Sequence, residues 1–215
     1  MAIRTIDDSI LQGIAEAIQA KDGGGKMYDT EMRGRIEQNL QSKAVLDSVI
    51  DGSVTSIESD VTSIYQYAFY RDNKLVTAKL NSANTVGAYA FANCLKLKNV
   101  YLDNATVLDP YAFQSAAILE RLFFPNIIRI GNGAFYIAGA LTVVILLKQA
   151  SLSSLGYMPP QIIYYIQPED LSWYSTATNW STLYANNRIK TIEDLTGDDL
   201  IWYQEQLARY QAQTA

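Results

Sequence analysis

Few residues of this chain belong to the types that usually carry out catalysis. The 215 residues include no histidine and a single cysteine, Cys94. This composition excludes histidine-based acid–base catalysis, Ser-His-Asp and Cys-His triads, Cys/His zinc sites and disulfides within the chain. An enzyme would have to depend on carboxylate, lysine or tyrosine chemistry. We therefore expect a protein that is not an enzyme and that holds no cofactor or metal.

The short motifs that could suggest chemistry have structural explanations. The segment Gly23-Gly24-Gly25-Lys26 lacks the spaced first glycine and the Ser/Thr of a phosphate-binding loop, and it follows an expected helix rather than a strand. The acidic pairs Asp7-Asp8 and Asp198-Asp199 lie at expected helix starts, where the helix dipole favours negative charge. The sequon Asn179-Trp180-Ser181 matters only in a chain secreted by a eukaryote.

The overall composition indicates a folded protein with a substantial core. Hydrophobic residues make up 49% of the chain and charged residues 18%, and the length favours one domain with appendages. The net charge of −5 argues against a nucleic-acid partner. The segment Met1 to Asp8 is acidic and has no signal-peptide core, and the longest apolar run, residues 141–147, is too short to span a bilayer. We expect synthesis in the cytosol, without a signal peptide or membrane insertion.

A repeat of 22 residues dominates the middle of the chain. The dipeptide Ala-Phe occurs four times at this step, and four further apolar columns keep the same step without a gap. The columns are Phe69, Phe91, Phe113 and Phe135; Leu75, Leu97, Leu119 and Leu141; Ala78, Val100, Leu122 and Val144; Leu80, Leu102, Phe124 and Leu146; and Ile64, Val86, Leu108 and Ile130. Such self-similarity predicts a solenoid whose coils bury one another's columns.

The columns nine and eleven residues after each phenylalanine are two positions apart, which is the spacing of a strand with one buried face. We predict strands at residues 75–80, 97–102, 119–124 and 141–146. They should stack in parallel, because a whole repeat separates each strand from the next. The Ala-Phe pairs should form the opposite wall, with Phe in the interior and Ala allowing close approach of the coils. Cys94 should fill the core rather than react.

At these residues the chain resembles the 22-residue leucine-rich repeat of bacterial surface antigens and of many phage and prophage proteins. The match covers residues 57–147. It extends to a degenerate fifth strand at Ile162 to Ile166, where Ile163 and Ile166 keep the period but Gly156-Tyr157 replaces Ala-Phe. The family's usual Cys or Asn before the leucine survives once, as Cys94. The resemblance implies an α/β leucine-rich-repeat solenoid with a parallel β-sheet, which acts as a binding scaffold.

Residues 1–42 are expected to form a helical hairpin ahead of the solenoid. A glycine loop at residues 22–25 separates two helical stripes. The stripes are Ile6, Ile10, Ile14 and Ile18, then Met32, Ile36 and Leu40. This arrangement resembles the N-terminal segment of minor structural proteins of phages that infect Gram-positive bacteria. A generic hairpin that caps the solenoid remains the alternative.

The C-terminal part resembles the terminal coil of phage leucine-rich-repeat proteins over residues 166–190. In that coil a short helix, an Asn-Trp pair (Asn179-Trp180) and a strand containing Ile189-Lys190 close the array. Trp173 and Trp180 are expected to plug the core rather than stack on carbohydrate. A final helix should follow Thr196, with Asp199 as its capping partner. The apolar stripe of this helix consists of Leu200, Tyr203, Leu207 and Tyr210.

The outer face of the predicted sheet offers the candidate binding residues. Positions eight and ten after each phenylalanine alternate with the buried columns, and they become apolar along the array. Soluble monomers rarely expose such a strip. Either the chain's own C-terminal helix or terminal coil covers it, or a partner does. The candidate binding residues on this face are Lys79, Tyr101, Arg121, Phe123, Val143 and Ile145.

Together these features predict a virion structural protein of a phage tail or baseplate that takes part in host attachment. Its expected parts are a helical anchor at residues 1–42, a solenoid with its cap at 43–195 and a helix at 196–215. The expected partners are other phage structural proteins, a host cell-surface ligand and further copies of the chain. Two alternatives remain: a bacterial leucine-rich-repeat adhesion protein and a cytosolic protein-binding inhibitor.

Overall fold

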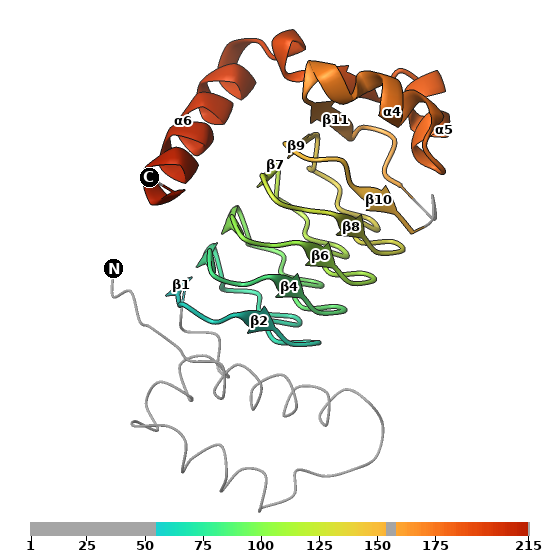
Figure 1. The fold of residues 1–215 in the computed structure, drawn as a ribbon. Coiled ribbons are helices and arrows are strands. Elements are labelled where there is room, and N and C mark those ends of the chain that lie inside the picture. Colours follow the sequence, from blue (N-terminus) through green and yellow to red (C-terminus); the bar gives the residue numbers. More distant parts are fainter. Residues whose placement is uncertain (1–54, 154–157, 215) are drawn as a thin grey trace, which may run out of the picture.

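Each repeat forms one coil of a solenoid, and the coils stack in sequence order (Figure 1). The structure is a computed structural model that describes residues 55–153 and 158–214. The hairpin predicted for residues 1–42 lies outside these ranges. The described part confirms the α/β leucine-rich-repeat solenoid with parallel sheets and a C-terminal helix.

The predicted strands form one wall of the solenoid. The wall divides into two parallel sheets in the orders β1-β3-β5 and β7-β9-β11-β12. The strands are β1 Ser56–Glu58, β3 Thr77–Lys79, β5 Asn99–Tyr101, β7 Arg121–Phe124, β9 Val143–Leu146, β11 Ile163–Ile166 and β12 Ile189–Thr191. The four strands predicted at residues 75–146 are therefore confirmed as parallel, although each is shorter than predicted.

The second wall is formed by a further parallel sheet, which the sequence did not predict and which we call the second sheet. Its strands are β2 Ser63–Ile64, β4 Thr85–Val86, β6 Val107–Leu108, β8 Arg129–Ile130 and β10 Ser151–Leu152, and each pairs with its neighbours in the stack. The second residue of every strand is buried. Two residues are too few to show an alternating pattern, so only the buried column Ile64, Val86, Leu108 and Ile130 was visible in the sequence.

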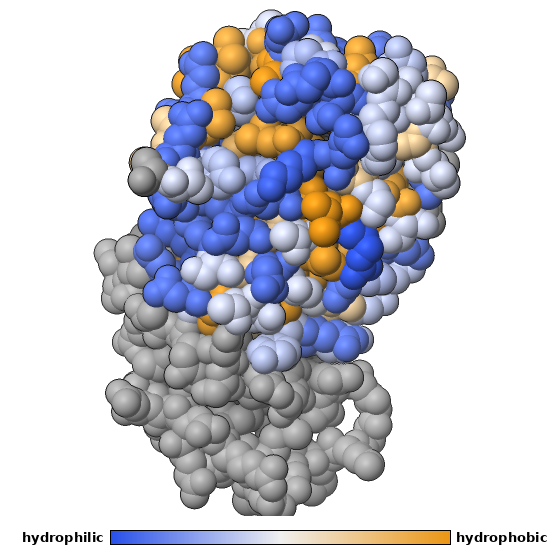
Figure 2. Space-filling model, viewed as in Figure 1, coloured by the Kyte–Doolittle hydropathy of each residue, from blue (hydrophilic) through white to orange (hydrophobic). Residues whose placement is uncertain are grey.

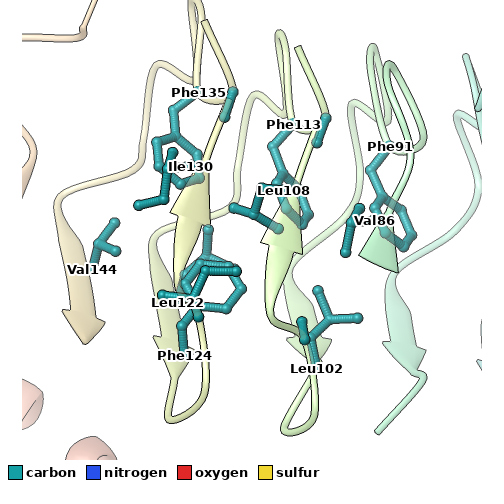
Figure 3. Close-up of a cluster of buried hydrophobic side chains, with 14 of the residues drawn as sticks. Val86, Phe91, Leu102, Leu108, Phe113, Leu122, Phe124, Ile130, Phe135 and Val144 are labelled. Atoms are coloured by element: carbon teal, nitrogen blue, oxygen red, sulfur yellow. The ribbon is translucent and has the colours of Figure 1, made fainter. Parts of the chain in front are cut away.

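The Ala-Phe pairs form the third wall, as predicted. The phenylalanine rings stack with centroids 5.0, 5.2 and 6.2 Å apart from Phe69 to Phe135. In Figure 3 the rings of Phe91, Phe113 and Phe135 point into the core toward the residues of the second sheet. Backbone N–H groups also donate from coil to coil, for example from Phe91 to the carbonyl of Ala112 at 2.8 Å. The small alanines allow this approach, and all four are buried.

Cys94 fills a gap in this core, which confirms its predicted role. Its side chain is fully buried, and its S–H group donates to the carbonyl oxygen of Phe69, 2.9 Å away. Burial raises the pKa of the thiol well above its ordinary value, and the nearby Asp72 carboxylate raises it further. The thiol therefore stays protonated and unreactive in the folded chain.

The fifth strand is confirmed, but its predicted register was wrong. Residues paired between β7 and β9 are 22 positions apart, such as Arg121 and Val143. Between β9 and β11 they are 20 apart, because Ile163 lies beside Val143 and Ile166 beside Leu146. The sequence before β11 lacks the Ala-Phe dipeptide, and the step from β9 to β11 is two residues shorter than the repeat. Tyr164, rather than Ile166, consequently continues the buried column of Val144, and Ile166 continues that of Leu146.

The terminal coil closes the core, as predicted. It contains a 3-10 turn η1 Pro168–Asp170 and two short helices, α4 Leu171–Thr176 and α5 Trp180–Ala185. Trp180 is fully buried, donates from its indole N–H to the carbonyl of Ala150, and packs edge-on against Tyr164 and Tyr174. Trp173 is partly buried and packs against this core. Both tryptophans therefore plug the last coil instead of forming an open aromatic platform.

Helix α6 (Gly197–Thr214) turns back from the cap and runs along the outer face of the first wall (Figure 1). A second 3-10 turn, η2 Ile192–Asp194, precedes it, and a capping box joins Thr191 to Asp194. Asp199, the capping partner expected for Thr196, instead accepts a hydrogen bond from Arg121. Among the described residues, no helix is long and apolar enough to cross a membrane.

We expect the Phe113→Ala substitution to lower the free energy of unfolding by about 3–5 kcal/mol, because it removes a ring stacked between two others and leaves a cavity. Denaturant unfolding of the full-length protein measures this change. Ile118→Ala is the control, since Ile118 is 44% exposed, and it should change stability by less than about 1 kcal/mol. Equal effects of the two substitutions would contradict the assignment of the phenylalanine column to the core.

Candidate functional site

The apolar strip predicted on the outer face of the first wall is covered by the chain's own C-terminal helix. Phe123, Val143 and Ile145 are at most 4% exposed and form a second hydrophobic cluster with Tyr203. The ring of Phe123 lies 6.2 Å from the rings of both Tyr203 and Tyr210. Of the two alternatives that the sequence left open, the structure thus shows cover by the chain itself. Hydrophilic residues occupy most of the face drawn in Figure 2, with hydrophobic ones in small groups.

Two ion pairs hold α6 against the coils. Arg121 Nε donates to Asp199 Oδ1 at 2.7 Å near the start of the helix. Near its end, Arg209 donates from both terminal nitrogens to the carboxylate of Asp103, which is 2% exposed. The guanidinium of Arg209 also lies 4.7 Å from the ring centre of Tyr101. Because Asp103 is buried, disruption of the Arg209–Asp103 pair would lower the stability of the fold more than disruption of the Arg121–Asp199 pair.

The helix also bridges an interruption in the first wall. Strands β5 and β7 follow one another in the stack, but they belong to separate sheets. A small cavity of about 70 Å³ lies at this junction, lined by residues of both strands and by Trp202 and Gln206 of α6. Arg209 contacts the coil before the junction and Asp199 the coil after it. Helix α6 therefore joins the two parts where the strand ladder does not.

The six candidate binding residues do not form one open surface. Phe123, Val143 and Ile145 are buried beneath α6, and Tyr101 and Arg121 are partly buried by its ion-pairing residues. Lys79 lies beyond this cover, where its ammonium group is 3.5 Å from the Glu58 carboxylate. Binding of a partner to these residues stays a prediction, and the three buried side chains are inaccessible while α6 is in place.

A different surface, which the sequence analysis missed, is open on the Ala-Phe wall. This surface contains a tyrosine two positions before each of the first three repeat phenylalanines. We call these residues, Tyr67, Tyr89 and Tyr111, the tyrosine ladder. Their ring centroids are 5.2 and 5.0 Å apart, with planes within 15° of parallel. All three are partly exposed. The recurring Tyr-Ala-Phe tripeptide was the available signal for this ladder.

The backbone of the tyrosine ladder adopts an unusual conformation. The three tyrosines have φ angles of 64°, 57° and 61°, in the left-handed region that disfavours residues with a Cβ atom. Gly133 takes the same place in the fourth repeat, with φ of +60°. A Cβ atom there would lie 2.6 Å from the Tyr111 ring, which packs close to the glycine and nearly perpendicular to the ring of Tyr136. The ladder therefore ends at Tyr111.

Burial and the neighbouring phenols raise the pKa of Tyr89, with burial as the larger cause. The phenol of Tyr89, in the middle of the ladder, is consequently uncharged near neutral pH. The hydroxyl groups of the ladder have no hydrogen-bond partner among the described residues. A neutral phenol can both donate and accept a hydrogen bond, so the ladder presents three such groups in a row.

A groove of about 540 Å³ lies beside β12, the last strand of its sheet in the described part of the chain. Its lining includes Leu171, Tyr184, Lys190 and Asp194. The Asp194 carboxylate accepts a hydrogen bond from the backbone N–H of Thr191 at 2.9 Å. This contact occupies a backbone donor of the terminal strand, so it protects the edge against pairing with another strand.

The described residues contain no arrangement that indicates catalysis. No group of three or more Cys, Asp or Glu residues within ranges 55–153 and 158–214 could hold a metal ion. The buried phenols of Tyr164 and Tyr174 have pKa values raised mainly by burial, so neither serves as a base near neutral pH. What the geometry offers is recognition by the exposed faces of the solenoid.

The repeats match a known family, and parts of the chain are similar to two solved structures. Residues 51–157 match the family model described as BspA type leucine rich repeat region, in six copies. A leucine-rich cell surface protein from Faecalibacterium prausnitzii is 19% identical, with a TM-score of 0.38, and the match covers 64% of this chain and 39% of that one. The pneumococcal vaccine antigen PcpA is 14% identical, with a TM-score of 0.35, covering 65% and 38%. This chain thus spans about two fifths of each solved chain. No curated protein sequence matches it.

We expect Phe123→Asp to destabilise the monomer by about 3 kcal/mol or more, because it removes a buried ring and places a carboxylate between α6 and the sheet. Thermal and denaturant unfolding measure the effect. Ile201→Asp, on the exposed side of the same helix at 58% exposure, is the matched control and should have little effect. Nearly unchanged stability in Phe123→Asp would contradict the docked position of α6.

We also expect Cys94 to react with a disulfide reagent such as Ellman's reagent only when the chain opens. The thiol is buried, and its raised pKa suppresses the reactive thiolate. Since the chain has one cysteine, labelling in native buffer should be slow and should rise to one equivalent in denaturant. Fast stoichiometric labelling of the native protein would show that the Ala-Phe wall is open in solution.

Proposed function

We propose that this chain, whose residues 51–157 form a BspA-type leucine-rich-repeat region, is a non-enzymatic recognition protein of a phage tail or baseplate. In this function the repeats bind another protein or a cell surface. The N-terminal segment attaches the chain to other phage structural proteins, and further copies of the chain assemble beside it.

The observation that carries the recognition function is the tyrosine ladder. Its rings are held by stacking and by coil-to-coil hydrogen bonds, such as that from Tyr67 N–H to the carbonyl of Ala88 at 3.0 Å. Aromatic side chains that are already ordered lose little entropy on binding, which is why tyrosine is common at binding hot spots. The ladder also lies on a different wall from α6, so the helix does not cover it.

Two resemblances in the sequence support a location in the virion. Residues 1–42 resemble the N-terminal segment of minor structural proteins of phages, and residues 166–190 resemble their terminal coil. The second segment forms a terminal coil in which Trp180 and β12 close the array.

A bacterial leucine-rich-repeat adhesion protein is the second candidate function. The BspA-type match of residues 51–157 favours it as much as a phage protein, because the match concerns the repeats alone. An adhesion protein would use the same exposed walls but would act without incorporation into a particle. The two candidates therefore differ in where the full-length chain is found.

We expect the full-length protein to co-purify with tails from a phage lysate, and a variant lacking residues 1–42 to stay behind in the soluble fraction. The reason is that the proposed anchor lies in the deleted segment. Immunodetection across a density gradient measures incorporation. Cooperative unfolding and a protected Cys94 serve as controls that the truncated solenoid is folded.

Normal incorporation of the truncated variant would contradict the anchoring role of residues 1–42. Absence of the full-length chain from every particle fraction would contradict the virion location and would favour the adhesion protein.

A further inference from the structure

We infer that the wall carrying the tyrosine ladder binds an uncharged, extended glycan that lies along the axis of the solenoid. This inference rests on the proposed recognition function and names its ligand class. Three features of the ladder point to it: which parts of the rings are free, the charge of the wall around them, and the spacing of the rings.

The ring faces of the ladder are already used. Tyr89 is stacked between Tyr67 and Tyr111, and the rings of Tyr70 and Tyr136 pack nearly perpendicular to the rings at the two ends of the ladder, with interplanar angles of 83° and 89°. A ligand cation, or a sugar that stacks on an aromatic ring, would need a free face. The edges and the hydroxyl groups remain for a ligand. Hydroxyl groups that can donate and accept suit a ligand rich in hydroxyl and ether oxygens.

The wall around the ladder is almost uncharged. The segments 65–71, 87–93, 109–115 and 131–137 contain two charged side chains, Arg71 and Asp109. The exposed guanidinium of Arg71 lies 5.1 Å from the ring centre of Tyr70, and Arg129 pairs with Asp109 at 3.0 Å. Partly exposed neutral polar side chains, Asn93, Gln114 and Ser115, stand beside the tyrosines. Such a surface lacks the charge that would attract a nucleic acid, an anionic polymer or a charged peptide. Hydroxyls and amides are the groups that hydrogen-bond a neutral sugar.

The spacing of the ladder matches a stiff polymer rather than a compact ligand. Successive rings are 5.2 and 5.0 Å apart, because each tyrosine belongs to the next coil of the stack. In β-1,4-linked glycans such as chitin and cellulose, successive sugars advance along an extended ribbon by a similar length. One sugar can therefore meet each tyrosine hydroxyl without bending the glycan or the protein. A wall that is already ordered binds with a smaller entropic cost.

Isothermal titration of the full-length protein with chitohexaose and with cellohexaose tests this inference. The informative variant combines Tyr67→Phe, Tyr89→Phe and Tyr111→Phe, which removes the hydroxyls and keeps the stacked rings. We expect at least one hexasaccharide to bind the native protein and the triple variant to bind it tenfold or more weakly. Tyr184→Phe, at a 42% exposed tyrosine on α5, is the matched control and should bind as the native protein does.

Thermal unfolding must show that the triple variant is folded, and Tyr89→Phe alone repeats the test with a smaller change. The inference is overturned if neither hexasaccharide binds the native protein, or if the triple variant binds as tightly as the control. It is also overturned if heparin binds in place of the neutral sugars, or if only a protein partner is found for this wall. None of these results bears on whether the full-length chain is incorporated into particles. The proposed phage location is therefore tested separately, by the incorporation experiment.

Discussion

Contact between equivalent positions of neighbouring coils is the interaction on which this structure depends. A single coil of 22 residues has too little interior to bury its own apolar side chains, so each coil is stable only against the next. Contacts between equivalent positions of neighbouring coils therefore occur in the core and in all three walls. The phenylalanines stack ring on ring, both sheet walls pair in parallel, and the backbone of the Ala-Phe wall donates from Phe69 to Ala90 and onward. Hydrophobic burial and hydrogen bonding act along one axis, which makes the array rigid along its length.

This constraint creates two problems that the C-terminal part of the chain solves. The last coil would expose its interior, and Trp180 closes it with a buried indole whose N–H group is satisfied by Ala150. The outer face of the first wall becomes apolar from Phe123 onward, and α6 covers it. The helix does so where β5 and β7 belong to separate sheets, and its ion pairs with Asp103 and Arg121 reach both sides of that junction. One element thus covers an apolar surface and joins the two parts of the first wall where its strand ladder is interrupted.

The sequence predicted the parts of the fold that repeat, and it failed where the repetition changes. The unbroken 22-residue step led to correct predictions for the four strands, the buried phenylalanines and Cys94. The reason is that every coil repeats the same pattern of buried positions. The two-residue strands such as β4 carry too short a pattern to be recognised. The register of β11 was wrong because a shortened coil precedes it. Whether α6 or a partner covers Phe123 could not be decided either, since an amphipathic stripe fits a neighbouring subunit as well as its own sheet.

The tyrosine ladder was missed for a further reason, which also bears on its role. Residues with positive φ are expected to be glycine or asparagine, and nothing in Tyr-Ala-Phe indicates a left-handed conformation. Each tyrosine held there costs about 1–2 kcal/mol in backbone strain, and a stacked aromatic pair returns about 0.5–1.5 kcal/mol. Gly133 fills the same position in the fourth coil without that strain. The tyrosines therefore add little net stability compared with glycine. Their main consequence is a row of partly exposed phenol side chains on a wall that no other described element covers.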